Sequence, residues 1–296
     1  MQMHAFRIQP LFLVLAGLSV FAGGVFPDSV FAQATKPSST PAPQQQEENL
    51  GGREVELVKP VIWTLREEYY DLQGGAWNNL FIVRADRLVL RKSPMTRRRG
   101  SVLRLDVPFA VTGGGQSAAS LGDIEVPAAN PTGQGTHAGL GDIYFQAILI
   151  PYFSRKFAIG AGSGISFPTA TNARLGTGKW VASPIVAPLW RFGKNGFLLV
   201  KLQEYVSFAG NNQRPNINYF STYPIFVWRF RHRWWTQLET ESRTNFEKSS
   251  QTGFKSGVAL GYMITRTKGV WVKPEIGWGK YRPYEFAVKN SVLSVR

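Results

Sequence analysis

Charged side chains recur at every second residue in five segments of this chain, which makes them the first candidates for chemistry. Residues two apart in an extended chain point to the same face, so each group shares one surface. Such a surface can pair its own charges or contact a polar solute. The candidate residues are Arg66 and Glu68; Arg104 and Asp106; Lys201 and Gln203; Glu239, Glu241 and Arg243; and Lys273 and Glu275.

Residues for catalysis or metal binding are scarce. The chain has no cysteine, which excludes a thiol nucleophile, a disulfide and a cysteine metal site. Its three histidines are His4, near the N-terminus, and His137 and His232, in expected loops. Hydrolytic catalysis needs a base beside a nucleophile, and a metal needs several converging ligands, but neither spacing is present. We therefore expect no enzyme activity, no cofactor and no metal site.

The segments that would carry the charged faces have the pattern of β-strands. Between residues 156 and 167, large apolar residues alternate with glycines and Ser166, and residues 269–280 repeat the alternation. Such segments of about ten residues, rich in aromatics and separated by turns, are typical of transmembrane β-barrels. We predict an all-β fold, an antiparallel transmembrane β-barrel of about 12 strands. Strands are expected near residues 55–70, 77–91, 100–111, 139–151, 156–167, 179–191, 196–208, 217–229, 233–244, 254–266, 269–280 and 284–295.

The connections between the expected strands alternate in length. In bacterial barrels, short periplasmic turns alternate with longer external loops, and both termini are periplasmic. Here every second connection is compact, and the longer ones fall between them, at residues 112–138, 168–178, 209–216 and 245–253. This alternation favours an even number of strands. The glycine-rich connection 112–138 is expected to be a flexible external loop, long enough to fold inward and constrict the interior.

The N-terminal region indicates export. Arg7 precedes an apolar run, and the sequence Phe31-Ala32-Gln33-Ala34 ends in the small-x-small pattern of a cleavage site. The run is short for a membrane anchor, which is the alternative. We predict a signal peptide at residues 1–34, a disordered periplasmic lead-in at 35–52 and an outer-membrane β-barrel at 53–296. The lead-in is rich in Pro, Ser and Gln and nearly lacks apolar residues.

Residues of one parity, odd or even, form each face of a strand, and on most strands the uncharged parity is assigned to the lipid side. An Arg or Lys facing lipid near the membrane midplane costs about 2–4 kcal/mol. Two strands fit badly: Glu204 lies on an apolar parity unless a bulge shifts it, and the strand from Trp77 gives no clear choice of face. Five tryptophans near strand ends suit interfacial girdles: Trp180, Trp190, Trp228, Trp234 and Trp278. The expected lipid-facing residues are Leu103, Leu105, Val107, Phe109, Phe220, Phe226, Trp228, Phe230, Phe254, Val258, Leu260, Tyr262 and Ile264.

The net charge of +15 and the pI near 10.2 raise the question of a nucleic-acid partner. The basic residues lie mainly in short turns, such as Arg97 to Arg99 and Arg229 to Arg233, rather than on a basic helix. A basic rim facing lipid head groups accounts for them better, so we expect no nucleic-acid partner.

Three segments resemble the outer-membrane barrels of the phenol meta-pathway degradation-like family, whose members often carry only the label "transporter". They are Gly139-Leu140-Gly141-Asp142-Ile143, Ser166 to Thr171 and Arg174 to Trp180, and the resemblance covers about residues 55–296. It implies an envelope barrel that passes small molecules, aromatic or hydrophobic ones among them, and it does not imply a chemical reaction, because the family label comes from a pathway association. The motif residues expected at the rim are Gly139, Gly141, Asp142, Pro168, Thr169, Gly176, Gly178, Lys179 and Trp180.

The leading functional hypothesis is an outer-membrane channel for passive or gated passage of small solutes, with the charged residues above lining its lumen. A plugged barrel with a structural or adhesive role is the alternative, and a lipid-modifying barrel enzyme is a distant third. Expected partners are outer-membrane lipid, the barrel-assembly machinery and a small solute. The chain ends in Val295-Arg296 rather than in the aromatic residue typical of such barrels, which leaves the usual assembly route in question.

Overall fold

The structure, a computed structural model, describes residues 55–58, 61–92, 99–114, 120–121, 124–125, 135–193, 195–230, 233–265 and 268–295. The predicted signal peptide and lead-in lie outside the described residues. Among the described residues, no helix is long and apolar enough to cross a membrane.

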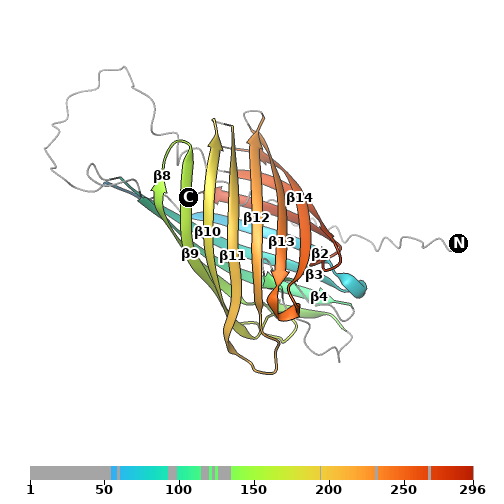
Figure 1. Ribbon diagram of the computed structural model, residues 1–296. Helices are drawn as coiled ribbons and strands as arrows, with labels where there is room; N and C mark the ends of the chain where they lie inside the picture. Colours follow the sequence, from blue (N-terminus) through green and yellow to red (C-terminus); the bar gives the residue numbers. More distant parts are fainter. Residues whose placement is uncertain are drawn as a thin grey trace, which may run out of the picture.

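Twelve long antiparallel strands form the wall (Figure 1). They are β2 (Ile62–Asp71), β3 (Trp77–Lys92), β4 (Arg99–Gly113), β8 (Ile143–Phe153), β9 (Phe157–Phe167), β10 (Lys179–Phe192), β11 (Gly196–Gly210), β12 (Asn218–Arg229), β13 (Trp234–Asn245), β14 (Gln251–Met263), β15 (Lys268–Trp278) and β16 (Phe286–Val295). The short elements are β1 (Val55–Val58), β5 (Ser120–Leu121), β6 (Ile124–Glu125), β7 (His137–Leu140), η3 (Gln73–Gly75) and η4 (Phe246–Lys248).

The sheet closes on itself through β2, which pairs with β3 on one side and with β16 on the other. The closing seam runs from Ile62 opposite Val295 to Asp71 opposite Phe286. Closure satisfies the backbone groups that an open edge would leave without partners in lipid. The predicted barrel of about twelve antiparallel strands is confirmed.

Two expected strands are divided in the structure. The first becomes β1 and β2, which both pair with β3 and are separated by an interval that contains Pro60. Proline has no N–H to donate to a ladder. The fourth becomes β7 and β8, which both pair with β4 and are interrupted at Gly141 and Asp142. This interruption frees the Asp142 side chain for the contacts described below.

The barrel has two different ends. At the short-turn end, compact connections such as 154–156 and 193–195 join the strands, and the last wall strand ends there. At the long-loop end lie the connections 114–142, 168–178, 211–217 and 279–285, together with the shorter 72–76 and 246–250. The expected alternation therefore holds at most connections, the exceptions being 72–76 and 246–250, which are no longer than the short-turn connection 93–98. The short-turn end corresponds to the periplasmic side of a bacterial barrel.

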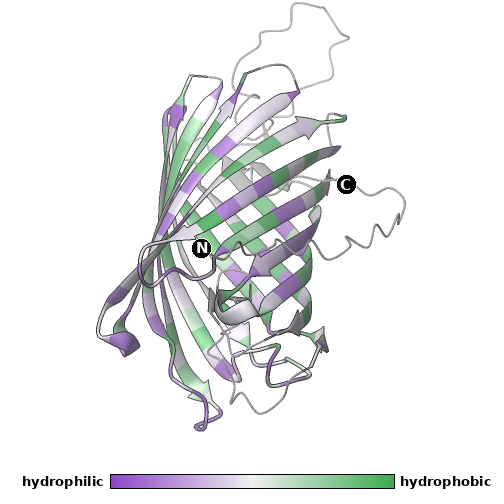
Figure 2. Cartoon of the chain, turned by 90° about the vertical axis from the view of Figure 1, so that its right-hand side faces the viewer, coloured by the Kyte–Doolittle hydropathy of each residue, from purple (hydrophilic) through white to green (hydrophobic). Residues whose placement is uncertain are grey.

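The polarity of the two faces of the wall is the reverse of that in a water-soluble protein. Outward residues such as Val258 and Ile276 are 52% and 58% exposed, whereas the inward Lys255 and Glu275 on the same strands are 2% exposed. Figure 2 shows the resulting alternation of hydrophilic and hydrophobic residues along the strands. An apolar exterior and a polar interior suit a wall surrounded by lipid.

The structure explains both strands that fitted the pattern badly. On β3, Leu80 and Ile82 face inward and are buried, while Phe81 faces outward, because this strand contributes to an apolar cluster inside the barrel. On β11, Glu204 lies opposite the exposed Phe220, and the register with β12 is unbroken from Gly196 to Val206. A bulge therefore does not move Glu204 inward.

Candidate functional site

Charged side chains on β2, β13, β15 and β16 form a continuous ion-pair network inside the barrel. Because these strands are neighbours or near neighbours in the ring, their inward side chains meet. The Lys273 Nζ lies 2.5 Å from Glu239 Oε1 and 2.7 Å from Glu275 Oε1. The Lys289 Nζ lies 3.0 Å from Glu275 Oε2 and 3.9 Å from a carboxylate oxygen of Glu68.

A second group of interacting side chains lies beside this network, on β12, β13 and β14. Both Lys255, at 2.7 Å, and Arg243, at 2.9 Å, pair with the Glu241 carboxylate. The Ser221 hydroxyl donates to the same carboxylate, and the Tyr223 hydroxyl donates to Glu239. The two carboxylates are thus held from three strands.

A separate pair of salt bridges links β3 and β4. Arg84 donates two hydrogen bonds to Asp106, of 2.7 and 2.6 Å, and Arg104 lies 2.7 Å from Asp86. On β2, Arg66 pairs with Glu68. All six carboxylates of these groups therefore have a basic partner, as buried charges require. The partners hold the wall together and satisfy the charges that parity placed inside.

On β8 and β10, uncharged polar side chains gather around Tyr144. The Tyr144 hydroxyl of β8 lies 2.8 Å from Ser183 Oγ of β10, and accepts hydrogen bonds from Gln146 and Gln203 at 3.0 and 3.2 Å. The phenol reaches across β9 at Gly164, where a Cβ would collide with its hydroxyl. The inward glycines of β9 thus give space to side chains that lie flat along the wall.

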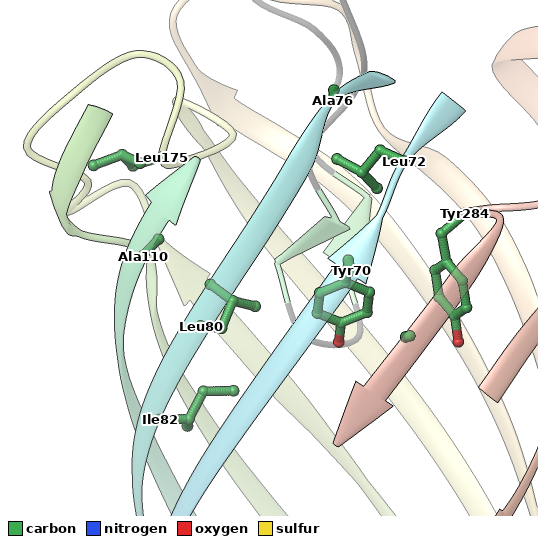
Figure 3. Close-up of a cluster of buried hydrophobic side chains, with 9 residues drawn as sticks. Tyr70, Leu72, Ala76, Leu80, Ile82, Ala110, Leu175 and Tyr284 are labelled. Atoms are coloured by element: carbon green, nitrogen blue, oxygen red, sulfur yellow. The ribbon is translucent and has the colours of Figure 1, made fainter. Parts of the chain in front are cut away.

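Apolar clusters lie inside the barrel near both of its ends. At the short-turn end, Val227, Trp235, Ala259 and Trp271 form one cluster, and Leu88 packs with Phe153 in another. At the long-loop end, Figure 3 shows a cluster with side chains from β2, β3 and β4 and from the three connections 72–76, 168–178 and 279–285. Its members are Tyr70, Leu72, Ala76, Leu80, Ile82, Ala110, Leu175, Tyr284 and Ala287.

The segment 168–178, which joins β9 to β10, folds into the long-loop mouth. Its Leu175 is 1% exposed and belongs to the cluster built mainly by β2, β3 and β4 (Figure 3). Those strands are not neighbours of β9 and β10 in the sheet, so the segment extends across part of the mouth. We call this segment the mouth loop. Tyr284, from the connection 279–285, belongs to the same cluster.

The Asp142 carboxylate anchors the mouth loop. It accepts hydrogen bonds from the Thr177 N–H at 2.6 Å, the Thr177 hydroxyl at 2.7 Å and the Ala170 N–H at 3.2 Å. A Cβ at Gly176 would collide with this carboxylate. Burial raises the pKa of Asp142, although the hydrogen bonds from Thr177 and Ala170 act in the opposite direction. One carboxylate therefore holds both ends of the mouth loop.

Most of the barrel sequence matches one known protein family. A family model described as "Putative MetA-pathway of phenol degradation" matches residues 103–287, which is more than half of the chain. The chain belongs to this family. The matched residues include the three segments 139–143, 166–171 and 174–180, which contain Asp142 and most of the mouth loop.

Solved structures resemble the family member described here in fold. An outer-membrane channel from Pseudomonas putida F1 superposes with a TM-score of 0.58 at 12% identity, covering 84% of this chain and 100% of that chain. A monoaromatic hydrocarbon channel matches with a TM-score of 0.47 at 10% identity, covering 81% of this chain and 89% of that one. At these identities the likeness concerns the fold. No curated protein matches the sequence.

The structure brings the family-motif residues to one place. Gly139 and Gly141 adjoin the mouth loop, and the Thr169 hydroxyl donates to the Gly141 carbonyl at 3.0 Å. Pro168 begins the mouth loop and Gly178 ends it, with a φ of 68° that favours glycine. Lys179 is buried and donates to Asn216 at 3.2 Å, whereas Trp180 faces outward.

The charged residues singled out in the sequence lie on the inward parity of their strands. Glu68, Asp106, Gln203, Glu239, Glu241, Arg243, Lys273 and Glu275 are buried, and Arg66, Arg104 and Lys201 are half-buried. Their role in solute passage stays a prediction. The sequence reasoning missed Arg84, Asp86, Lys255 and Lys289, which complete the ion pairs. Lys255 has the same parity as the small residues Gly253 and Gly257, and this pattern could have identified it as an inward residue.

Within the described part of the chain, no group of three or more His, Asp or Glu side chains is placed to hold a metal ion. His137 lies at the rim, 3.5 Å from Asn172, and His232 lies outside the described residues. Much of the connection 112–138 does too, so its expected constriction of the interior stays a prediction. The described segment that enters the mouth is the mouth loop.

Proposed function

We propose that this protein is a channel through which small solutes cross the outer membrane passively, and that the mouth loop gates its external end. The observation that carries the proposal is the placement of Leu175 inside the mouth, held by hydrogen bonds from the mouth loop to Asp142. To open, the mouth loop must withdraw Leu175 from its cluster and exchange three hydrogen bonds to Asp142 for hydrogen bonds with water. Losing each charged hydrogen bond costs about 1.5–3 kcal/mol.

The interior supports neutral, apolar or aromatic solutes as cargo. The inward carboxylates are already paired with basic side chains, so a charged solute would compete with existing partners. Apolar clusters line both ends of the route, and the wall at Tyr144 is neutral. The family description, which refers to phenol degradation, is consistent with that class of cargo. Passage through such an interior needs no chemical reaction.

Planar-bilayer recording tests the proposal. Gly176→Val places side-chain atoms where the Asp142 carboxylate lies, so it should release the mouth loop and raise the open fraction severalfold. Ala173→Val is the matched control, because Ala173 is an exposed residue of the same loop. The wild-type protein should show brief openings. Absence of current from the wild type and from Gly176→Val, with both folded, would contradict the channel.

One observation favours the second candidate, a plugged structural or adhesive barrel. The charged side chains in the middle of the wall are almost completely buried, with Glu68 at 0% and Lys289 at 2% exposure. This candidate expects no flux of solutes even after the mouth loop is released. Vesicle-swelling assays with phenol-sized neutral solutes therefore separate the two functions.

Export is part of the same proposal. Residues 1–34 would direct secretion and be removed after Ala34, and the barrel-assembly machinery would insert the remainder. N-terminal sequencing of the protein purified from outer membranes should begin at Thr35. A start at Met1 would contradict cleavage.

A further inference from the structure

The charge of the connections differs sharply between the two ends of the barrel. The five connections at the short-turn end contain eight basic and no acidic residues: Arg97, Arg98, Arg155, Lys156, Lys194, Arg231, Arg233 and Arg266. The six connections at the long-loop end contain five basic and five acidic residues. The excess positive charge of the connections therefore lies at one end only.

The structure describes Arg155, Lys156 and Arg233 of this set, and backbone hydrogen bonds hold the segments that carry them. The Arg191 N–H donates to the Lys156 carbonyl at 2.8 Å, and the Met263 N–H donates to the Arg233 carbonyl at 2.8 Å. The Ser154 hydroxyl stabilises the turn that carries Arg155 and Lys156 by donating to the Phe157 carbonyl at 3.0 Å. The side chains of Arg155, Lys156, Arg233 and Lys268 are exposed. We call these four exposed side chains the basic rim.

Outward aromatic residues lie directly next to the basic rim. Trp190 precedes Arg191, Trp228 precedes Arg229, and Trp234 follows Arg233; all three tryptophans are 37–40% exposed. The ring of Trp190 packs 5.6 Å from Phe157, and that of Trp234 packs 4.8 Å from Tyr262. Tryptophan prefers the level of the lipid head groups. The neighbouring Arg and Lys side chains therefore reach the phosphate level of the same leaflet.

We propose that the basic rim binds anionic phospholipid head groups of the periplasmic leaflet. The short-turn end of a bacterial barrel faces the periplasm, which decides the leaflet. Each Lys or Arg near an anionic membrane surface contributes about 1 kcal/mol. The phosphates of lipopolysaccharide, which occupy the outer leaflet, would instead meet the long-loop end, where the connections carry no net charge. This inference depends on the orientation of the barrel and not on solute passage.

Native mass spectrometry of the purified full-length barrel tests this inference. The protein is incubated with phosphatidylglycerol or phosphatidylethanolamine of identical acyl chains, and bound lipid is counted. The double variant Arg155→Gln, Lys156→Gln should bind phosphatidylglycerol about 25-fold more weakly, since each charge contributes about fivefold. The matched control is Lys248→Gln, Lys280→Gln, which removes two exposed charges at the long-loop end and should leave binding unchanged.

Three results would overturn the inference. One is equal affinity of the wild type for the two lipids, and another is equal weakening by the two double variants. The third is binding of lipopolysaccharide, rather than phosphatidylglycerol, that depends on Arg155 and Lys156. A salt titration of the wild type needs no variant: raising the ionic strength should weaken phosphatidylglycerol binding, and unchanged binding would contradict a head-group contact.

Discussion

At the scale of single residues, the function proposed here depends on Asp142, which lies where β7 and β8 are interrupted. Its three hydrogen bonds come from Ala170 and Thr177, 28 and 35 residues further along the chain. No local sequence rule connects these positions. The sequence did supply the correct segments, because the family resemblance singled out all of them, but only the folded barrel shows that one carboxylate joins them.

Asp142→Asn should loosen the mouth loop. An amide keeps one acceptor oxygen and loses the other, so at least one of the hydrogen bonds from Thr177 or Ala170 is lost, at a cost of about 1–3 kcal/mol. Limited proteolysis near Arg174 should therefore proceed on the order of tenfold faster in the variant. Asn172→Ala, in the same loop, is a control for general disturbance. Equal protection of Asp142→Asn and the wild type would contradict the anchoring role.

The pH dependence of the mouth loop follows from the raised pKa of Asp142. Burial disfavours the charged carboxylate, so the closed loop is most favoured when Asp142 is protonated. Protonation differs from Asp142→Asn, because a protonated carboxyl oxygen can still accept from the Thr177 N–H while it donates to the Thr177 hydroxyl, which then donates to the Lys179 carbonyl. An amide NH2 group cannot accept a hydrogen bond. This contribution is fully present below the ordinary pKa of about 4 and is lost as the pH rises through the raised value. Open fraction in bilayers should thus fall on acidification from pH 7 and stay flat in Asp142→Asn. A wild-type channel that opens further in acid would show that the sign is wrong.

At the scale of elements, parity predicted most of the wall correctly, and its failures have physical causes. The inward face of β3 carries Leu80 and Ile82 beside Arg84 and Asp86, because the interior is layered with apolar clusters as well as ion pairs. A rule that equates apolar with lipid-facing cannot assign such a strand. The same rule overlooked Leu175, a single apolar residue in a mostly polar connection.

The unbroken register of β11 makes Glu204 an outward charge, and its replacement should stabilise the barrel. In Glu204→Leu the penalty of a carboxylate facing lipid is removed, which we expect to raise the free energy of unfolding by about 1 kcal/mol. Gln203→Leu, the inward neighbour, should have the opposite effect because Gln203 donates to Tyr144. Urea unfolding in lipid vesicles measures both. A destabilised Glu204→Leu would contradict the outward assignment.

The glycines of β9 show that a sequence pattern can predict a strand correctly without revealing why its inward residues are small. Alternation with small residues predicts a strand, but it does not say what the small residues accommodate. At Gly164 the reason is the Tyr144 side chain, which crosses β9 to reach Ser183 and Gln203. The Tyr144 side chain of β8, rather than β9 itself, therefore determines that residue 164 is a glycine.

Gly164→Val should disrupt the neutral wall. The added side chain displaces the Tyr144 hydroxyl and breaks its contacts with Ser183, Gln146 and Gln203, so we expect a loss of about 1–3 kcal/mol in the free energy of unfolding. Ser163→Val, the adjacent outward position, is the matched control and should be nearly neutral. Heat-modifiable gel mobility compares the two, and equal stability of both variants would contradict the position assigned to Tyr144.

At the scale of the whole molecule, the inverted polarity and the closure of the sheet are one property. Most charged residues of the wall lie inside and most apolar residues lie outside because β2 and β16 pair and leave no wall strand with a free edge. The strand count and the alternation of connections were accessible from the sequence. The closing seam was not, since it joins residues more than two hundred positions apart.

A cysteine cross-link at the closing seam tests closure most directly, because the chain has no cysteine of its own. Glu67 and Asn290 are exposed partners across β2 and β16, and paired residues in an antiparallel ladder lie within disulfide range. The variant Glu67→Cys, Asn290→Cys in lipid vesicles should form an intramolecular disulfide under mild oxidation. Glu67→Cys, Val258→Cys, which places the second thiol on β14, should not. Failure of the first pair to cross-link, or equal cross-linking of both pairs, would contradict a closed twelve-stranded barrel.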